Sequence, residues 1–246
     1  MTTAPYELGT DERPRLGLIV LQADETIEDD FRKTFDPDQV RLHISRVPSG
    51  AELTPGTIRA MEADLPAAAG LFPQGAIFDV VAYACTSGTS LIGPGRVEDL
   101  VRQGCEAKAV TNPLSATFAA LLDLRAARIG IVSPYSPDIA DTLRSDFEAA
   151  GFDVAATVSF GEHVEANVAR IDQRSIMAAA QSLADNTALD AIFLSCTNLR
   201  THGAVSNTAT GIGIPVLSSN RSLAWHMSVL CRRAGYSVPT LGPVVT

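Results

Sequence analysis

The sequence FDVVAYACT at residues 78–86 recurs as LDAIFLSCT at residues 189–197. Both stretches place an aspartate before an apolar run and close it with cysteine and threonine, and the two cysteines are 196 − 85 = 111 positions apart. A second pair, RLGLIV at residues 15–20 and RIGIV at residues 128–132, has its glycines 130 − 17 = 113 positions apart. The two offsets agree apart from a small indel between the matches, and self-similarity at one offset marks a duplicated architecture. Because apolar strands alone would not reproduce Asp, Cys and Thr at one spacing, the sequence predicts two homologous halves.

Short β-branched apolar runs alternate with longer amphipathic segments from residue 15 onward, a pattern typical of βα units around a parallel sheet. Strands are predicted at residues 16–21, 41–47, 80–84, 107–111, 128–132, 154–159, 191–195 and 215–217. Helices are predicted at residues 28–35, 54–69, 94–103, 116–122, 137–150, 164–185 and 223–235. The expected fold class is therefore α/β, with two pseudo-symmetric four-stranded parallel sheets flanked by helices. In such folds ligands bind at the carboxyl ends of the strands, so we expect the active-site cleft between the two halves.

The repeat also predicts how the chain is divided. Residues 1–14 are polar and form an N-terminal tail, residues 15–113 form the first half, and residues 114–222 form the second. Residues 223–246 form a C-terminal helix and tail, and the sequence leaves open which half this helix packs on.

Composition and charge restrict the class of protein. The 246 residues are 46% hydrophobic and 19% charged, which is enough apolar material for a substantial core and excludes disorder over most of the chain. Acidic residues outnumber basic ones by 28 to 19, a net charge of −9, and no cationic stripe suits a nucleic acid. The N-terminus lacks the features of a signal peptide, and no apolar run approaches the roughly 18 residues of a membrane span. We therefore expect a cytoplasmic protein with neither nucleic acid nor membrane as a partner.

The four cysteines fall into two pairs. Cys105 lies at a helix-to-strand junction and Cys231 lies in an apolar-rich helix, so both are interpreted as packing residues. Cys85 and Cys196 each follow a buried strand at its carboxyl end, which would bring both thiols to the cleft. They are followed by residues whose hydroxyl, amide and backbone N–H groups suit a thiolate or a substrate carboxylate: Thr86, Ser87, Thr197 and Asn198.

Two facing thiols predict a limited chemistry. A thiolate on one side removes a proton next to a carboxylate while a thiol on the other side returns one, which gives racemisation or epimerisation. Alternatively one thiolate adds to an activated double bond, the resulting single bond rotates, and elimination gives the trans alkene. Neither route needs a metal or an organic cofactor, and the chain has no CxxC pair, zinc-ligand spacing, phosphate loop or dinucleotide fingerprint. The sequence therefore predicts no cofactor and no metal.

Several motifs resemble the Asp/Glu racemase superfamily, and most closely its maleate isomerase branch, which neighbours the arylmalonate decarboxylases. They are GLIVLQADETIE at residues 17–28, YACTS at 83–87, SPY at 133–135, EANVAR at 165–170 and SCTN at 195–198. The resemblance implies that Cys85 is the nucleophile and Cys196 the proton donor. It also implies that Tyr135 and Asn167 bind substrate carboxylates, and that the protein forms a homo-oligomer, either a dimer or a tetramer.

The sequence departs from this pattern at residue 24. Maleate isomerases have an asparagine after the first strand, whereas this chain aligns Asp24 there. A carboxylate at contact with a substrate carboxylate is repelled by roughly 4 kcal/mol at an effective dielectric constant near 20. Asp24 therefore favours an amino or amido acid substrate over maleate. The ADETIE segment also resembles racemase-like proteins associated with ectoine utilisation. The alternatives are that Asp24 caps the following helix or that Glu25 is the acid that matters.

Three functions are consistent with these features. The first is a cofactor-independent isomerase or racemase acting on a small carboxylate, either a dicarboxylate or an amino or amido acid. The second is a cysteine-dependent decarboxylase of a malonate-type acid, which needs only one cysteine. The third is a non-enzymatic protein that binds a small metabolite between its halves.

Overall fold

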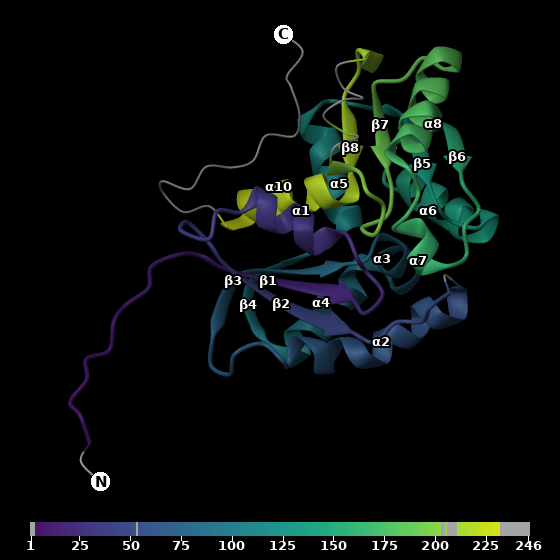
Figure 1. Ribbon diagram of the computed structural model, residues 1–246. Helices are drawn as coiled ribbons and strands as arrows, with labels where there is room; N and C mark the ends of the chain where they lie inside the picture. The colour runs from purple at the N-terminus through teal and green to yellow at the C-terminus, as the bar shows by residue number, and fades with distance from the viewer. Residues whose placement is uncertain (1–2, 53, 203–204, 206–210, 232–246) are drawn as a thin grey trace.

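Two four-stranded sheets form the protein, and every strand pair within them is parallel (Figure 1). The computed structural model describes residues 3–52, 54–202, 205 and 211–231. The first sheet has the order β2-β1-β3-β4 and the second the order β6-β5-β7-β8, so both halves have the same topology. The strands are β1 (Arg15–Leu21), β2 (Arg41–Val47), β3 (Ile77–Ala84), β4 (Glu106–Thr111), β5 (Arg128–Ser133), β6 (Asp153–Ser159), β7 (Ala191–Leu194) and β8 (Val216–Ser218). The predicted fold class and all eight predicted strands are confirmed.

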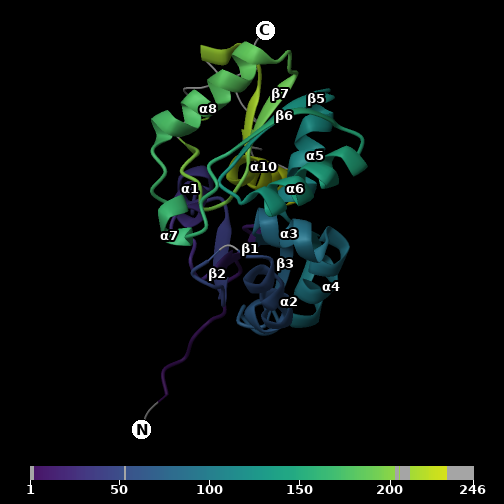
Figure 2. The ribbon, with the colours of Figure 1, turned by 90° about the vertical axis from the view of Figure 1, so that its right-hand side faces the viewer.

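Helices flank both sheets (Figure 2). They are α1 (Ile27–Thr34), α2 (Pro55–Ala69), α3 (Thr86–Ile92), α4 (Pro94–Gly104), α5 (Pro113–Asp123), α6 (Pro137–Ala149), α7 (Glu165–Val168), α8 (Gln173–Asn186) and α10 (Ser219–Cys231). No helix in the described part of the chain is long and apolar enough to cross a membrane.

The predicted helices need four corrections, the simplest being that α10 begins at Ser219 rather than at residue 223. Helix α3 was not predicted, because its sequence TSGTSLI carries no amphipathic period and follows the cysteine directly. The single helix predicted at residues 164–185 is two helices, because Asp172 accepts a hydrogen bond from the backbone N–H of Arg174 at 2.8 Å and caps a new start at α8. Helix α5 begins at Pro113 rather than residue 116, because Asn112 caps it through the N–H of Ser115 at 2.8 Å.

The first sheet is buried on both faces. Along β1, Leu16, Leu18 and Val20 pack into one cluster with α1 and α10, while Ile19 and Leu21 pack into the other with α2 and α4. The alternation follows from the two-residue period of a strand. Helix α10 therefore lies against the first sheet, beside α1, which answers the question that the sequence left open (Figure 1). The residues predicted to extend this helix, 232–235, lie outside the described residues.

The helix that follows the last strand of each half packs against the other half. While α10 covers the first sheet, α5 packs against the second half, where Phe118 makes an edge contact with Phe147 of α6 at 4.9 Å between ring centroids. The same ring stacks on Phe152 at 5.7 Å. Helices α5 and α10 also pack against each other, so each half is covered partly by a helix that follows the other half's last strand.

Equivalent aspartates tie the sheets together in the same way. Asp79 accepts a hydrogen bond from the backbone N–H of Arg15, the first residue of β1, at 2.9 Å. Asp190 accepts from the backbone N–H of Arg128, the first residue of β5, at 2.7 Å and from that of Ala127 at 2.9 Å. The recurrence of one contact at both places supports duplication independently of the strand order.

The two aspartates differ in burial, and this difference predicts unequal effects of substitution. Asp79 is buried and also holds Lys108 at 2.7 Å, whereas Asp190 is exposed. We expect Asp79→Ala to lower the free energy of unfolding in urea by about 1–3 kcal/mol, because it leaves a partly buried N–H unpaired. Asp190→Ala leaves N–H groups that water reaches, so the loss is expected to stay below about 1 kcal/mol. Equal losses in the two variants would contradict this reading.

Candidate active site

The carboxyl ends of β3 and β7 meet at the centre of the molecule. Thr197, which follows β7, donates a hydrogen bond from Oγ1 to the backbone oxygen of Ala84, the last residue of β3, at 3.3 Å. Thr86 shares a hydrogen bond of 2.9 Å with Ser219 at the end of β8. These two contacts join segments from opposite halves, so the turns that carry the two cysteines lie against each other.

Cys85 lies between β3 and α3 and is 3% exposed. Its Sγ accepts a hydrogen bond from the backbone N–H of Gly88 at 3.1 Å, and the Ser87 hydroxyl lies 3.7 Å from it. A Cβ at residue 88 would lie 2.9 Å from this sulfur and 2.5 Å from the Tyr83 hydroxyl, so the close approach of the backbone requires glycine. Burial raises the pKa of the Cys85 thiol to about 11, against the lowering effect of Ser87 and Gly88.

Cys196 is 6% exposed and has a strained backbone, with φ of +113°. A side chain with a Cβ rarely adopts this region, and such strain persists where the surroundings fix it. Here the Cys196 N–H donates to Ser219 Oγ at 3.0 Å, and the same hydroxyl bonds Thr86. A chain of hydrogen bonds thus runs from the backbone of one cysteine to the residue that follows the other.

Two buried tyrosines complete the surroundings of the thiols. Tyr135 is fully buried, and its hydroxyl accepts a hydrogen bond from Ser195 Oγ at 3.4 Å. Burial raises the pKa of Tyr135 well above its usual value, and the charges that Cys196 and Cys85 would carry as thiolates raise it further. Tyr83 is likewise fully buried, and burial together with Cys85 raises its pKa. Tyr135 is therefore close to both cysteines, and Tyr83 is close to Cys85.

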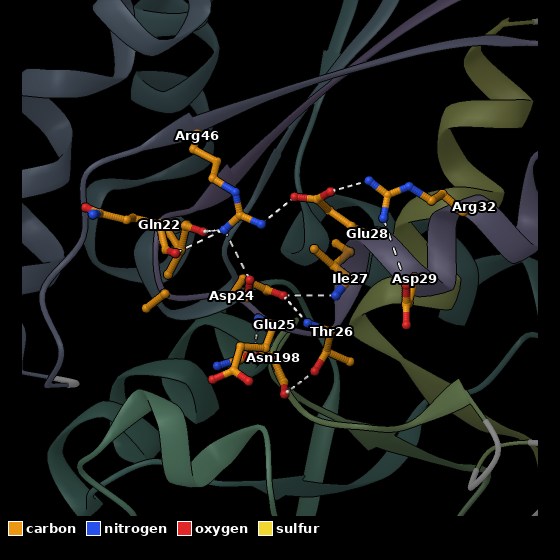
Figure 3. A network of polar contacts seen from close by, with 12 residues as sticks. Gln22, Asp24, Glu25, Thr26, Ile27, Glu28, Asp29, Arg32, Arg46 and Asn198 are labelled. Carbon is orange, nitrogen blue, oxygen red and sulfur yellow. Dashed lines mark hydrogen bonds and ion pairs between the residues drawn. The ribbon is translucent and has the colours of Figure 1, made fainter.

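The loop between β1 and α1 is held by an arginine (Figure 3). The guanidinium of Arg46, on β2, donates hydrogen bonds from Nη1 to the backbone oxygens of Leu21 and Gln22, at 3.0 Å each, and to that of Asp24 at 3.2 Å. Its Nη2 pairs with Glu28 on α1. Because one side chain fixes three carbonyls and the start of the helix, the loop has little freedom.

Asp24 is buried within this loop, at 4% exposed. Its Oδ1 accepts hydrogen bonds from the backbone N–H groups of Thr26 at 2.8 Å and Ile27 at 2.9 Å, so it caps the start of α1 as one alternative had it (Figure 3). Its Oδ2 is buried and has no hydrogen-bond partner among the described residues. Burial raises the pKa of this carboxyl, although both N–H groups and Thr197 lower it.

Asn198 connects three segments and is 1% exposed. Its Nδ2 donates to the backbone oxygen of Glu165 at 3.0 Å and to Glu165 Oε2 at 2.9 Å, while its Oδ1 accepts from the N–H of Glu25 at 2.9 Å. The Asn198 backbone oxygen accepts from Thr26 Oγ1 at 3.0 Å. Asn198 therefore positions both the loop of Asp24 and the carboxyl group of Glu165, and its amide hydrogens are occupied in this structure.

Glu165 brings a second buried carboxyl group to the thiols. It is 4% exposed, and burial raises its pKa, as does the neighbouring charge of Asp24. Glu165 in turn raises the pKa of both thiols, and Asp24 contributes at Cys196, whose pKa lies well above its usual value mainly through burial. The two carboxyl groups and the two thiols thus form one group of mutually interacting acids.

The structure brings together most of the residues that the sequence predicted. Around the two cysteines it places Asp24, Thr86, Ser87, Tyr135, Thr197 and Asn198. Asn167 is the exception: it is exposed on α7, and its side chain lies beside Glu162. Sequence reasoning missed Tyr83, Glu165 and Ser219. Ser219 follows the eighth predicted strand, and its place at a carboxyl strand end was the signal that could have found it.

An α/β chain of two duplicated parallel sheets, with a buried cysteine after the third strand of each, defines the class of protein. The family model of arylmalonate decarboxylase matches residues 65–240, more than half of the chain. The chain belongs to the arylmalonate decarboxylase family. The predicted resemblance to the maleate isomerases and their decarboxylase neighbours is thereby confirmed.

Known relatives and structures agree with this assignment. A maleate isomerase of Nocardia farcinica is 27% identical over 231 residues, which cover 87% of this chain and 88% of the relative. A structure of a mutant Nocardia farcinica maleate cis-trans isomerase with a covalently bound succinylcysteine intermediate has a TM-score of 0.75 at 24% identity, covering 88% of this chain and 92% of that one. A liganded mutant of arylmalonate decarboxylase has a TM-score of 0.79 at 23% identity, covering 92% and 96%.

Ser219 and Ser222 provide a matched test of the hydrogen-bond chain. Both are fully buried on α10, but Ser219 Oγ accepts the Cys196 N–H whereas Ser222 Oγ has no partner among the described residues. Ser219→Ala is expected to lower the free energy of unfolding by about 1–3 kcal/mol, because a buried N–H loses its acceptor. Ser222→Ala is expected to be neutral or stabilising. If urea titrations give the reverse order, the hydrogen-bond chain does not hold Cys196.

Removing the charge of Glu165 is expected to lower the pKa of both thiols. A neighbouring carboxylate disfavours the thiolate, so Glu165→Gln shifts the alkylation of Cys85 and Cys196 by iodoacetamide to lower pH. Peptide-resolved mass spectrometry across a pH series measures each thiol separately. Glu162→Gln, at a half-buried residue of the preceding loop, is the control and should leave both curves in place. Unshifted curves in Glu165→Gln would show that its carboxyl group does not act on the thiols.

Proposed function

We propose that the protein is a cofactor-independent isomerase or racemase acting on a small carboxylate, with Cys85 and Cys196 as its paired reacting groups. The observation that carries the proposal is the meeting of two buried cysteines from equivalent strand ends, joined through Thr86 and Ser219. The similarity to maleate isomerases supports the reaction class.

The surroundings of the two thiols favour different roles. Cys85 receives the Gly88 N–H, a hydrogen bond that stabilises a thiolate, so it suits the nucleophile or base. Cys196 lies beside Glu165 and Asp24, whose negative charges favour the protonated thiol, so it suits the proton donor. This assignment agrees with the roles that the sequence resemblance implies.

Either reaction is balanced with these two groups alone. In a racemisation, the Cys85 thiolate takes the proton next to the carboxylate, the electron pair passes into the enediolate, and the Cys196 thiol gives a proton to the opposite face. In an isomerisation, the Cys85 sulfur bonds to one alkene carbon while the Cys196 thiol gives its proton to the other. The resulting single bond rotates, and return of that proton to Cys196 with cleavage of the C–S bond restores the thiolate, the thiol and the double bond. The succinylcysteine intermediate of the Nocardia enzyme supports the second route.

The hydroxyl groups around the thiols provide hydrogen-bond donors for a substrate carboxylate. Thr86, Ser87 and Thr197 carry them at the meeting strand ends, and Tyr135 lies against both cysteines. We assign these four residues to substrate binding. Asn198 acts indirectly, because its side chain holds Glu165 and the loop of Asp24.

A decarboxylase of a malonate-type acid is the second candidate, and the family model and the liganded decarboxylase structure favour it. That reaction needs one cysteine to protonate the enediolate left after carbon dioxide departs. The second buried cysteine has no part in it, which is why we place the two-thiol reaction first.

Cysteine variants separate these candidates. The protein is incubated in deuterated water with maleate, aspartate, glutamate, diaminobutyrate derivatives and an arylmalonate, and deuterium uptake, isomer formation and carbon dioxide are followed. Cys85→Ser and Cys196→Ser are each expected to lower turnover by about 10²-fold or more, since each removes a proton-transfer or nucleophilic group. Cys105→Ser, at a half-buried cysteine outside the site, is the control.

Each other outcome has a defined meaning. Full activity in both single variants rules out the two-thiol reaction. Carbon dioxide release that survives the loss of one cysteine identifies the decarboxylase. Ligand binding with no turnover of any compound identifies a metabolite-binding protein.

A further inference from the structure

Two buried carboxyl groups lie beside the thiols, and neither exchanges a proton or forms a bond in either proposed reaction. Asp24 and Glu165 are each 4% exposed, and they come from different halves of the molecule. Each interacts electrostatically with the other, and both interact with Cys196. Burying two carboxyl groups together is unfavourable unless a partner compensates for their charge.

The contacts of Asp24 leave one oxygen without a partner. Oδ1 accepts two backbone N–H groups, while the buried Oδ2 has none among the described residues. The Thr197 hydroxyl lies near enough to influence this carboxyl group, but its hydrogen bond goes to the Ala84 carbonyl. A buried carboxylate oxygen without a donor is costly, so this atom marks a place for a hydrogen-bond donor that is not part of the described chain.

The hydrogen-bond partners of both carboxyl groups favour the ionised form. Asp24 is contacted by the N–H groups of Thr26 and Ile27, and Glu165 by the Nδ2 of Asn198. These groups are donors, and a donor stabilises a carboxylate rather than a carboxylic acid. The missing partner is therefore a donor, and opposite two carboxylates the best donor is a cation.

The described residues do not provide that cation. Arg46 is the basic residue that lowers the pKa of Asp24, but its guanidinium is already bound to three backbone carbonyls and to Glu28 (Figure 3). Arg170 pairs with Glu25, on the exposed side of the same loop, at 3.5 Å. For Glu165, the group that lowers the pKa is the neutral amide of Asn198.

We propose that Asp24 and Glu165 form a binding site for the ammonium group of the substrate, so that the thiols act on an amino acid rather than on a simple dicarboxylate. The inference rests on the proposed function, because it names the substrate class of the same site. The loop is suited to this purpose, because Arg46 and Asn198 fix it from two sides, which lowers the cost of ordering it on binding.

An ammonium group would also change the state of the thiols. Without ligand, the two carboxylates oppose ionisation of Cys196, and Glu165 opposes that of Cys85. A bound cation weakens this repulsion, which favours the thiolate at Cys85, the proposed base, while Cys196 stays protonated mainly through burial. Binding of an amino acid would thus activate the cysteine that reacts with it, whereas a dicarboxylate would add further negative charge.

Ligand pairs that differ only in the amino group test the proposal. Alanine, aspartate, glutamate and 2-aminobutyrate are compared by calorimetry at pH 7.5 with propionate, succinate, glutarate and butyrate. At least one amino acid is expected to bind the wild-type protein about tenfold or more tightly than its deaminated partner. This preference is expected to rise with pH as the carboxyl groups ionise. A preference for the deaminated acid, or binding of no amino acid in the series, would overturn the proposal.

Isosteric variants assign the preference to the two residues. Asp24→Asn and Glu165→Gln keep an oxygen for the same backbone and amide donors, so thermal unfolding is expected to show folded proteins. Each is expected to reduce the amino preference by about tenfold. Glu162→Gln is the control and should keep it. Survival of the full preference in both variants would disprove the assignment. Because binding is measured without turnover, these results test the ammonium site even if the two-thiol reaction is disproved.

Discussion

The structure depends on the satisfaction of buried polar groups where the carboxyl ends of two parallel sheets meet. A parallel strand that ends inside a protein leaves backbone groups and polar side chains that water cannot reach. Here their partners come from the opposite half: Thr197 bonds the last carbonyl of β3, and Thr86 reaches Ser219 beside β8. The same contacts fix the two cysteines, so the interface that unites the halves is also the candidate active site.

Duplication produced this arrangement, but the two halves are no longer equivalent at the thiols. The aspartates at residues 79 and 190 still make the same contact with the first strand of each sheet. The cysteines differ, because Cys85 begins a short helix with normal backbone angles whereas Cys196 has a positive φ. Acidic neighbours also gather on the side of Cys196. A symmetric framework therefore holds an asymmetric pair of thiols, as a reaction with one base and one acid requires.

Two buried carboxyl groups next to the thiols distinguish the candidate site. Arg46 and Asn198 hold the loop of Asp24, and Asn198 also holds Glu165. Both positioning residues are directed to the backbone or to a carboxyl group rather than toward a substrate. Several buried contacts thus place two carboxyl groups beside the thiols, and a ligand that brings positive charge would offset the cost of burying them.

The sequence by itself determined the fold, because each strand is recognisable locally as an apolar run. The repeated Asp, Cys and Thr also showed which strands of the two halves are equivalent. It also identified Cys85 and Cys196, since a residue after a buried strand lies at the carboxyl edge of its sheet. Only the tertiary structure placed α10 on the first sheet, exposed Asn167 and brought Glu165 to the thiols. These outcomes depend on contacts between residues that are far apart in the sequence. Asn198 and Glu165, for example, are 33 positions apart, and no local sequence pattern encodes their contact.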